Sequence, residues 1–180
     1  MDKPLKILVK LPSRGRPEKL IKALDSIVDN IQDKESTFIS LTLDTDDDAV
    51  NNEAFISRVR TRKANISIEW GLSTSKINAV NRSIPDIEWD VICIGSDDIF
   101  FNFYGFDSII RAEMGLHFPD GDGYLHFHEK DSGSALCVMT VCDKKYYDRF
   151  GYIYHEDYFS LWADNEQYDV AKILGRYIYI

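Results

Sequence analysis

The sequence predicts an α/β fold in which a mostly parallel central sheet carries helices on both faces. Short apolar runs alternate with helix-periodic segments through residues 1–98, as in repeated strand–helix–strand units. Residues 89–95, WDVICIG, are apolar on both faces, which is typical of a strand at the centre of a parallel sheet. A chain of 180 residues is long enough to form one domain with its own core.

Four strands and three helices are expected in the first half of the chain. Apolar runs or alternating apolar residues indicate the strands, and apolar residues three and four positions apart indicate the helices. Pro17 suits the first turn of the first helix. The aspartate-rich segment 44–48 can cap the second helix, and the hydroxyl residues at 73–75 can cap the third. The expected elements are strand 6–11, helix 17–31, strand 37–43, helix 49–61, strand 66–70, helix 75–84 and strand 89–95.

The second half shows a less regular pattern. Two apolar runs, 124–128 and 134–142, are candidates for an antiparallel pair of strands after a turn-rich loop at 117–123. The remaining expected elements are helices at 104–115, 143–151 and 163–174, and an edge strand at 176–180. No repeat, low-complexity tract or linker interrupts the pattern, so a single domain is expected.

The net charge of −9 is unevenly spread along the chain. Residues 83–180 hold 7 basic and 18 acidic side chains, which disfavours binding to nucleic acid and suits either a divalent cation or a solubilising surface. No apolar run approaches the roughly 20 residues that span a bilayer, and residues 1–12 lack the pattern of a leader peptide. Three cysteines are too few for a disulfide framework, which favours a cytoplasmic location.

Polar side chains follow three of the expected strands at the points where the strands end. They are Ser13 and Arg14, which follow Pro12 at the end of the first strand, Asp44 after the second, and Asp97 and Asp98 after the fourth. Ligands of open α/β sheets bind outside the carboxyl ends of the strands, so these groups are candidates for one site. Two adjacent carboxylates repel each other, and a divalent cation completed by substrate phosphates would relieve that repulsion. The structural alternative is that these residues only cap turns and helices.

Positive charge is expected near the same edge of the sheet. Arg14, Arg16 and Lys76 are suited to phosphate oxygens, whereas each of them alone is also typical of a solvated surface. Asp44 can accept a hydrogen bond from a base N–H group or from a ribose hydroxyl.

The last expected helix opens with Asp164, Asn165 and Glu166. A carboxylate at a helix N-terminus is stabilised by the helix dipole, so capping is one interpretation of Asp164. The other is a general base that removes a proton from an acceptor hydroxyl. His155 and Glu166 are candidates for contacts with substrate. The aromatic side chains at 152–162 are expected to divide between the core and a platform for a sugar ring.

Two histidines and two cysteines are weaker candidates for metal ligands. His126 and His128 would share one strand face with Tyr124, as a metal pair or on a solvent-exposed face, and we favour the exposed face. Cys93 and Cys137 are not in metal-ligand spacing and are expected in the core.

The order of these motifs resembles that of the GT-A fold glycosyltransferases, and within them the family 2 type. The matching features are PSRGRP after the first strand, an aspartate ending the second, SKINAVNRSI at 75–84, Asp-Asp after the fourth strand, and an Asp-x-Glu helix that ends at Gly175. The resemblance covers about residues 6–175. It implies a GT-A fold in one domain, 1–180, with a nucleotide-binding half at 1–98 and an acceptor and catalytic half at 99–180.

The resemblance implies a donor site in the first half. Pro12, Ser13, Arg14 and Asp44 would hold the uracil and ribose of a nucleotide sugar, and Lys76 would lie near its diphosphate. The donor would then be a nucleotide-diphospho-sugar, such as UDP-glucose or another UDP-sugar.

The resemblance also implies a metal ligand and a base. Asp97 would face the ribose, and Asp98, with Asp97 as a second candidate, would bind Mn²⁺ or Mg²⁺. The family's Asp-x-Asp motif would place an acid at Gly95 or Ser96, and neither is acidic, so the match rests on the Asp97-Asp98 pair. Asp164 matches the family base. The short segment after it resembles a minimal version, whose acceptor site is short, absent or supplied by a partner.

The expected function is therefore metal-dependent, inverting transfer of a hexosyl group from a UDP-sugar. The acceptor hydroxyl would belong to a glycan, a lipid-linked sugar or a protein. One alternative is a catalytically silent module that binds a nucleotide sugar or carbohydrate. Another is a nucleotidyltransferase, although Gly15 stands alone where such enzymes carry a glycine-rich phosphate loop.

Overall fold

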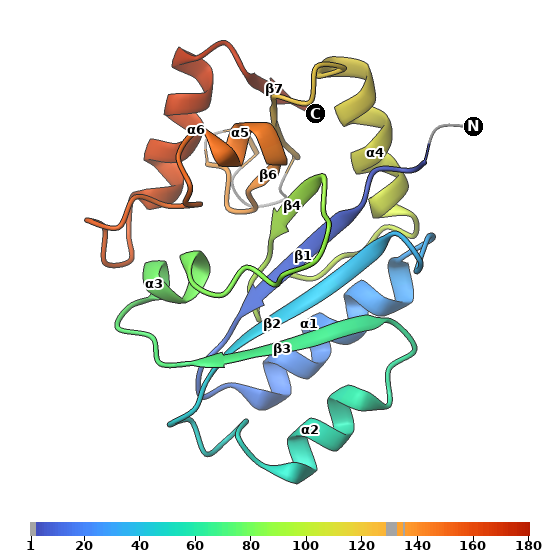
Figure 1. Ribbon diagram of the computed structural model, residues 1–180, viewed down its shortest axis with the longest axis vertical. Helices are drawn as coiled ribbons and strands as arrows, with labels where there is room; N and C mark the ends of the chain where they lie inside the picture. Colours follow the sequence, from blue (N-terminus) through green and yellow to red (C-terminus); the bar gives the residue numbers. More distant parts are fainter. Residues whose placement is uncertain (1–2, 129–132, 135) are drawn as a thin grey trace.

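The computed structural model describes residues 3–128, 133–134 and 136–180. Its strands form one seven-stranded sheet in the order β3-β2-β1-β4-β6-β5-β7 (Figure 1). They are β1 (Ile7–Pro12), β2 (Thr37–Asp44), β3 (Asn65–Gly71), β4 (Val91–Ile94), β5 (Tyr124–His126), β6 (Val141–Asp143) and β7 (Tyr177–Tyr179). Neighbouring strands run parallel, except that β6 is antiparallel to β4 and β5. The mostly parallel sheet predicted from the sequence is confirmed.

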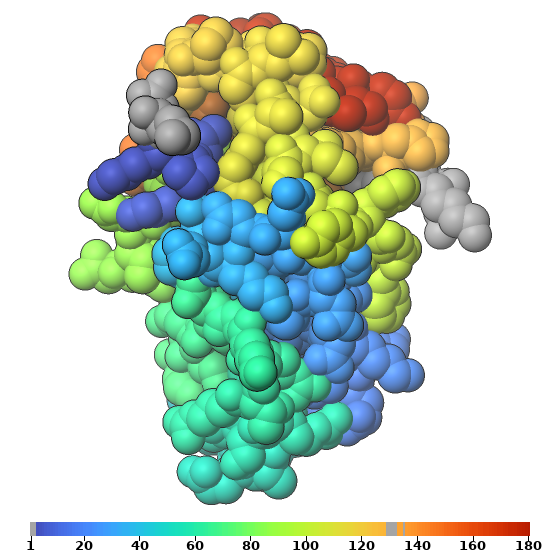
Figure 2. Space-filling model, turned by 90° about the vertical axis from the view of Figure 1, so that its right-hand side faces the viewer, coloured from blue at the N-terminus to red at the C-terminus, as the bar shows by residue number. Residues whose placement is uncertain are grey.

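Helices cover both faces of this sheet, as predicted. They are α1 (Pro17–Asn30), α2 (Glu53–Arg60), α3 (Lys76–Asn81), α4 (Phe106–His117), α5 (Lys144–Asp148) and α6 (Ala163–Ile173). The apolar residues of α1, α2 and α4 pack on one face, and those of α3, α5 and α6 pack on the other. Figure 2 shows the first group from outside, with α2 at the bottom and α4 at the top. Within the described residues, no helix is both long and apolar enough to cross a membrane.

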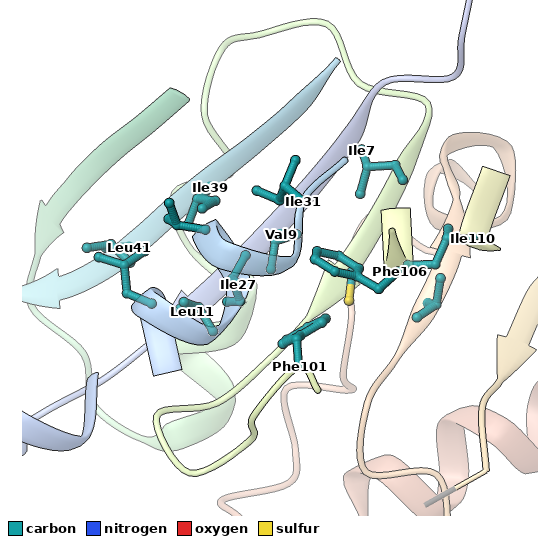
Figure 3. Packing of buried hydrophobic residues seen from close by; sticks show 14 of the residues in the cluster. Ile7, Val9, Leu11, Ile27, Ile31, Ile39, Leu41, Phe101, Phe106 and Ile110 are labelled. Atoms are coloured by element: carbon teal, nitrogen blue, oxygen red, sulfur yellow. The ribbon is translucent and has the colours of Figure 1, made fainter. Parts of the chain in front are cut away.

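The central strands are buried on both faces. In β1, Ile7, Val9 and Leu11 point into the cluster under α1, where Figure 3 shows Val9 and Leu11 near Ile27 and Ile7 farther along the strand. Leu8 points into the opposite cluster. Because β1 is packed on both faces, the position of its last residue, where the following loop begins, is held rigidly.

The α2 and α3 helices are both shorter than expected. The cap of α2 is Asn52, which accepts a hydrogen bond from the Phe55 N–H, and not the segment 44–48. Ser75 caps α3 as predicted. The α3 helix ends at Asn81, whose side chain binds the backbone of residues 153–154.

The predicted strand at 134–142 is wrong over most of its length. The described part forms β6 only from Val141 onward, and residue 135 lies outside the described residues. Cys137 is fully buried, so its apolar surroundings resemble those of a strand although it lies outside β5 and β6. The predicted edge strand at the end of the chain is confirmed, because β7 lies beside β5 at the edge of the sheet.

Candidate functional site

The carboxyl ends of β1, β2 and β4 bring together the polar residues that follow them. β1 pairs in parallel with β2 on one side and with β4 on the other. Ser13 and Arg14 therefore lie between Asp44, the last residue of β2, and Asp97, which follows β4. Pro12 is the last residue of β1. The predicted convergence of these strand ends is present in the structure.

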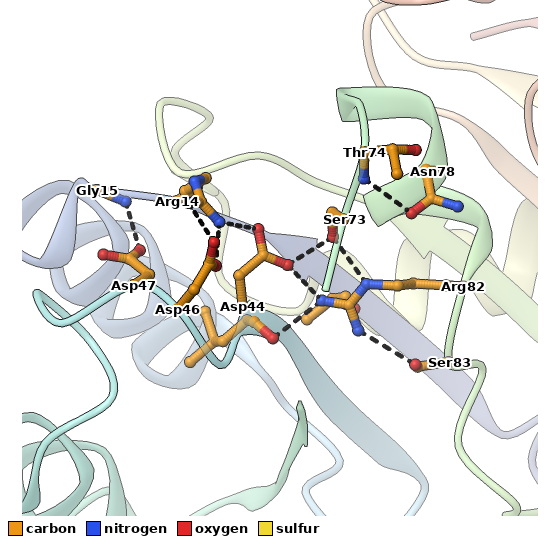
Figure 4. Close-up of polar contacts among 12 residues, drawn as sticks. Arg14, Gly15, Asp44, Asp46, Asp47, Ser73, Thr74, Asn78, Arg82 and Ser83 are labelled. Carbon is orange, nitrogen blue, oxygen red and sulfur yellow. Dashed lines mark hydrogen bonds and ion pairs between the residues drawn. The ribbon is translucent and has the colours of Figure 1, made fainter. Parts of the chain in front are cut away.

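The Asp44 carboxylate lies among three donors (Figure 4). Arg14 Nη1 donates to Oδ2 at 2.7 Å, and Ser73 Oγ and Arg82 Nη2 donate to Oδ1 at 2.6 and 2.8 Å. Arg14 also binds both oxygens of Asp46, at 2.6 and 3.0 Å. Burial raises the pKa of Asp44, but the hydrogen bonds from Ser73, Arg14 and Arg82 outweigh it and hold the pKa below its ordinary value. Asp44 is therefore ionised at neutral pH.

Arg82 is a member of this network that the sequence analysis missed. Its Nε donates to Ser73 Oγ at 2.7 Å, and its Nη2 donates to the Leu43 carbonyl at 2.9 Å. The sequence signal for Arg82 was its position in the segment SKINAVNRSI at 75–84, in which a role was expected only for Lys76. No local pattern encodes the turn after α3 that returns Arg82 to the end of β2.

Asp97 is fully buried where β1 meets β4. Its Oδ2 accepts a hydrogen bond from Ser13 Oγ at 2.6 Å and lies 3.0 Å from Arg16 Nε. Within the described part of the chain, its Oδ1 is buried without a hydrogen-bond partner. Burying an unpaired carboxylate oxygen is costly, so this atom is suited to a hydroxyl donor or a cation from a ligand.

A cleft of about 250 Å³ lies beside this edge, between α3 and the start of α6. Lys76 enters it from α3, Asp98 from the loop after β4, and Asp164 from the first turn of α6. Three candidates from separate segments of the chain therefore share one cleft. Its mixture of one cation and two carboxylates can hold an anionic group beside a proton acceptor.

Asp98 is the candidate metal ligand in this cleft. A hydrogen bond from the Ser96 hydroxyl lowers the pKa of Asp98, with burial opposing it and the charges of Arg16 and Lys76 adding to it. Among the residues that the structure describes, no group of three or more His, Cys, Asp or Glu side chains could hold a metal. The site still fits Mg²⁺ or Mn²⁺, because such ions need one or two carboxylates plus substrate phosphates, and Asp97 Oδ1 is unpaired.

Of the predicted substrate contacts, His155 and Glu166 lie neither at the strand ends nor in the lining of the cleft. His155 packs edge-on against Tyr152 and Tyr158, with ring centroids 5.4 and 6.5 Å away. Glu166 lies half-buried on α6, outside the cleft lining. Their roles toward a substrate stay predictions.

The solvent-exposed face predicted for His126 and His128 is wrong at His126, which is fully buried. Its Nδ1 lies 2.7 Å from the Tyr177 hydroxyl. His128 is exposed, and its Nδ1 lies 2.7 Å from the Tyr179 hydroxyl. The prediction fails because the rings of Tyr168 on α6 and Tyr177 on β7 pack against His126, with centroids 6.1 and 5.8 Å away.

A buried lysine supports the turn that carries Arg82. Lys10 of β1 is fully buried, and its Nζ donates to Thr42 Oγ1 at 2.5 Å and to the Arg82 and Ser83 carbonyls at 2.8 and 3.3 Å. Ser83 has a left-handed φ of 57°. Lys10 therefore fixes the backbone from which Arg82 reaches Asp44.

Lys10 is expected to make the stability of the protein depend on pH. Burial lowers the pKa of Lys10 to about 7, and the charge of Arg82 lowers it while that of Glu69 raises it. The unfolded chain keeps an ordinary lysine pKa of roughly 10.4, so between about pH 7 and 10 it binds more protons than the folded chain. The free energy of unfolding should therefore rise with pH, by up to about 1.4 kcal/mol per pH unit from this group.

Urea denaturation across this pH range checks the prediction. The Lys10→Met variant should lose the rise, whereas Lys19→Met, at an exposed position of α1, should keep it. The same rise in Lys10→Met and in the wild type would contradict the assignment.

Solved structures show the same fold. The chain matches the mannosyltransferase PcManGT from Pyrobaculum calidifontis, in complex with GDP-Man and Mn²⁺, with a TM-score of 0.73 and 15% identity over 99% of this chain and 55% of that one. It matches S. aureus TarS in complex with UDP with a TM-score of 0.74 and 12% identity over 98% and 58%. It also matches a 4-diphosphocytidyl-2C-methyl-D-erythritol synthase from Anaerococcus prevotii, with a TM-score of 0.58 and 14% identity over 97% and 89%. No protein-family model and no curated protein matches the chain.

These likenesses show the fold, which is the GT-A fold expected from the sequence. At identities of 12 to 15% they carry no information on the substrate of this chain. The chain spans 55% and 58% of the length of the two transferase structures. Activities of those longer proteins therefore enter only as a proposal.

Proposed function

We propose that this chain is a glycosyltransferase domain that transfers a sugar from a UDP-sugar to an acceptor hydroxyl, with inversion at the anomeric carbon. The observation that carries the proposal is the cleft shared by Lys76, Asp98 and Asp164. Such a reaction needs a cation near the diphosphate, a metal ligand and a base within one small space. In this proposal residues 1–98 bind the nucleotide, and residues 99–180 supply the base and the acceptor contacts.

The contacts of Asp44 support uracil as the base of the donor. Asp44 Oδ1 accepts hydrogen bonds from Ser73 and Arg82, whereas Oδ2 accepts one from Arg14 and keeps an acceptor position. Uracil presents one N–H group between two carbonyl oxygens, and guanine presents two N–H groups side by side. One open acceptor position beside the exposed guanidinium of Arg14 suits uracil, because guanine would displace Ser73 or Arg82.

The cleft residues have separate tasks in the proposed reaction. Asp164 accepts the proton of the acceptor hydroxyl while the hydroxyl oxygen attacks the anomeric carbon. The new C–O bond forms opposite the bond to the diphosphate, and UDP leaves with the electrons of that bond. Lys76 donates hydrogen bonds to the diphosphate as its negative charge increases. Asp97 Oδ1 accepts a hydrogen bond from the ribose and so fixes the position of the donor.

A divalent cation, Mn²⁺ or Mg²⁺, fits the proposal at Asp98, with Asp97 as a second candidate ligand. When bound, the cation would neutralise negative charge on the leaving diphosphate. The Mn²⁺ in the P. calidifontis complex supports a metal of this class.

Isothermal titration of UDP, GDP and a panel of UDP-sugars tests the donor site. We expect UDP to bind in the presence of Mn²⁺, to bind more weakly in EDTA, and to bind more tightly than GDP. No binding of any nucleotide to protein that is folded by circular dichroism would rule out the proposal.

Two other functions follow from particular observations. The absence of a third metal-ligating carboxylate around Asp98 in the described residues favours a module that binds the donor without transferring its sugar. Such a module would bind UDP and show neither transfer nor donor hydrolysis.

The match to the A. prevotii synthase favours a nucleotidyltransferase, which would release pyrophosphate from a nucleoside triphosphate and a sugar phosphate.

A further inference from the structure

The loop before α6 presents large apolar side chains to solvent. Phe159, Leu161 and Trp162 are 75%, 76% and 68% exposed. Their chain neighbours Ser160 and Ala163 line the cleft that contains the candidate base. In Figure 1 this loop projects at the left, above α3. The loop that carries these exposed side chains therefore borders the cleft.

Trp162 adopts a backbone conformation that large side chains disfavour. Its φ of 72° and ψ of −8° lie in the left-handed region, at the N-cap of α6. Glycine adopts this conformation without strain, whereas a bulky side chain does not. Because the Trp162 indole is exposed, packing of the ring offsets little of this backbone strain. The strain therefore points to a function for the ring itself.

The charge around these rings favours one class of ligand. Residues 155–166 contain Glu156, Asp157, Asp164 and Glu166 and no lysine or arginine. Membrane surfaces rich in anionic lipids attract clusters of basic residues, so this acidic segment is unsuited to them. Sugars fit better, because carboxylates accept hydrogen bonds from hydroxyl groups and the C–H face of a pyranose packs on an aromatic ring.

We propose that Trp162 and Phe159 form a platform for a pyranose ring, and that the acceptor of this chain is therefore a carbohydrate. A sugar ring on the platform would present a hydroxyl group to Asp164 in the adjoining cleft. The proposal rests on the proposed function and extends it, because it names the chemical class of the acceptor.

Saturation-transfer difference NMR tests the platform with four defined probes: cellobiose, maltose, mannobiose and chitobiose. UDP and Mg²⁺ are present throughout, and UDP affinity is measured on the same samples. The test variants are Trp162→Gly and Phe159→Ala, and the control is Leu116→Ala, which removes a 70%-exposed leucine from α4. Trp162→Gly suits a left-handed φ, so it removes the ring while keeping or raising the melting temperature.

We expect at least one saccharide to bind the wild type through its ring C–H protons. Its affinity should fall roughly tenfold in Trp162→Gly and Phe159→Ala and stay unchanged in Leu116→Ala. UDP affinity should be the same in all four proteins.

Three results would overturn the platform while leaving the donor site intact. They are UDP binding without binding of any saccharide, saccharide affinity that Trp162→Gly does not change, and Trp162-dependent binding to phosphatidylcholine/phosphatidylglycerol vesicles. Loss of UDP binding by the wild type would instead overturn the proposed function on which the platform rests.

Discussion

Replacing Asp164 with asparagine is expected to lower the turnover of sugar transfer by about 10²- to 10⁴-fold. Asparagine has nearly the same shape but cannot take a proton from the acceptor hydroxyl. Asp164 Oδ1 accepts a hydrogen bond from the Asn165 N–H at 3.0 Å, and the amide oxygen of asparagine can accept the same bond. The start of α6 should therefore be preserved, and UDP affinity should stay within about twofold of the wild type.

A matched control for this variant is available on the same helix. Asp169 is 60% exposed and outside the cleft, so Asp169→Asn should transfer sugar at the wild-type rate. Steady-state kinetics with a saturating donor, together with UDP titration, separate turnover from binding. Transfer by Asp164→Asn at the wild-type rate would show that another group is the base.

Replacing Asp98 with asparagine is expected to remove the metal-dependent part of UDP binding. In Mn²⁺ the variant should bind UDP at least about tenfold more weakly than the wild type, and EDTA should weaken it little further. The reason is that a neutral amide is a poorer ligand than the ionised carboxylate, whose low pKa the Ser96 hydrogen bond favours. Titration calorimetry with each metal condition measures the effect.

The control for this second prediction is Asp148→Asn. Asp148 is 53% exposed on α5 and pairs with Lys144, away from the cleft, so its loss should leave metal-dependent binding unchanged. If Asp98→Asn keeps the full difference in UDP affinity between Mn²⁺ and EDTA, the metal is bound by other residues.

Much of the candidate site could be predicted because strand ends are visible in a sequence. Asp44 and the Asp97-Asp98 pair each follow a run of apolar residues, and parallel strands bring such ends to one edge. Asp164 was recognisable because it opens a helix in an acidic pattern. The residues on both sides of the cleft, Asp98 and Asp164, could therefore each be recognised from a local sequence pattern.

Contacts that depend on tertiary packing could not be predicted in the same way. Arg82 belongs to the Asp44 network because α3 ends at Asn81, where the side chain binds the distant residues 153–154. Likewise, His126 packs against Tyr168 and Tyr177, which come much later in the chain. Local periodicity predicts neither the Arg82 contact nor the burial of His126, because it shows which face of an element is apolar and not which distant segment covers that face.

The strand order has a consequence for how the donor site assembles during folding. β1 and β2 are consecutive strands, so the Arg14–Asp44 contact belongs to a unit of nearby sequence. β4 pairs Val91 with Ile7, and bringing such distant residues together carries a larger loop-closure cost. We therefore expect the kinetic order to be β1–β2 first and β1–β4 later. A chain arrested between these steps would hold Arg14 against Asp44 before the carboxylates that follow β4 have arrived.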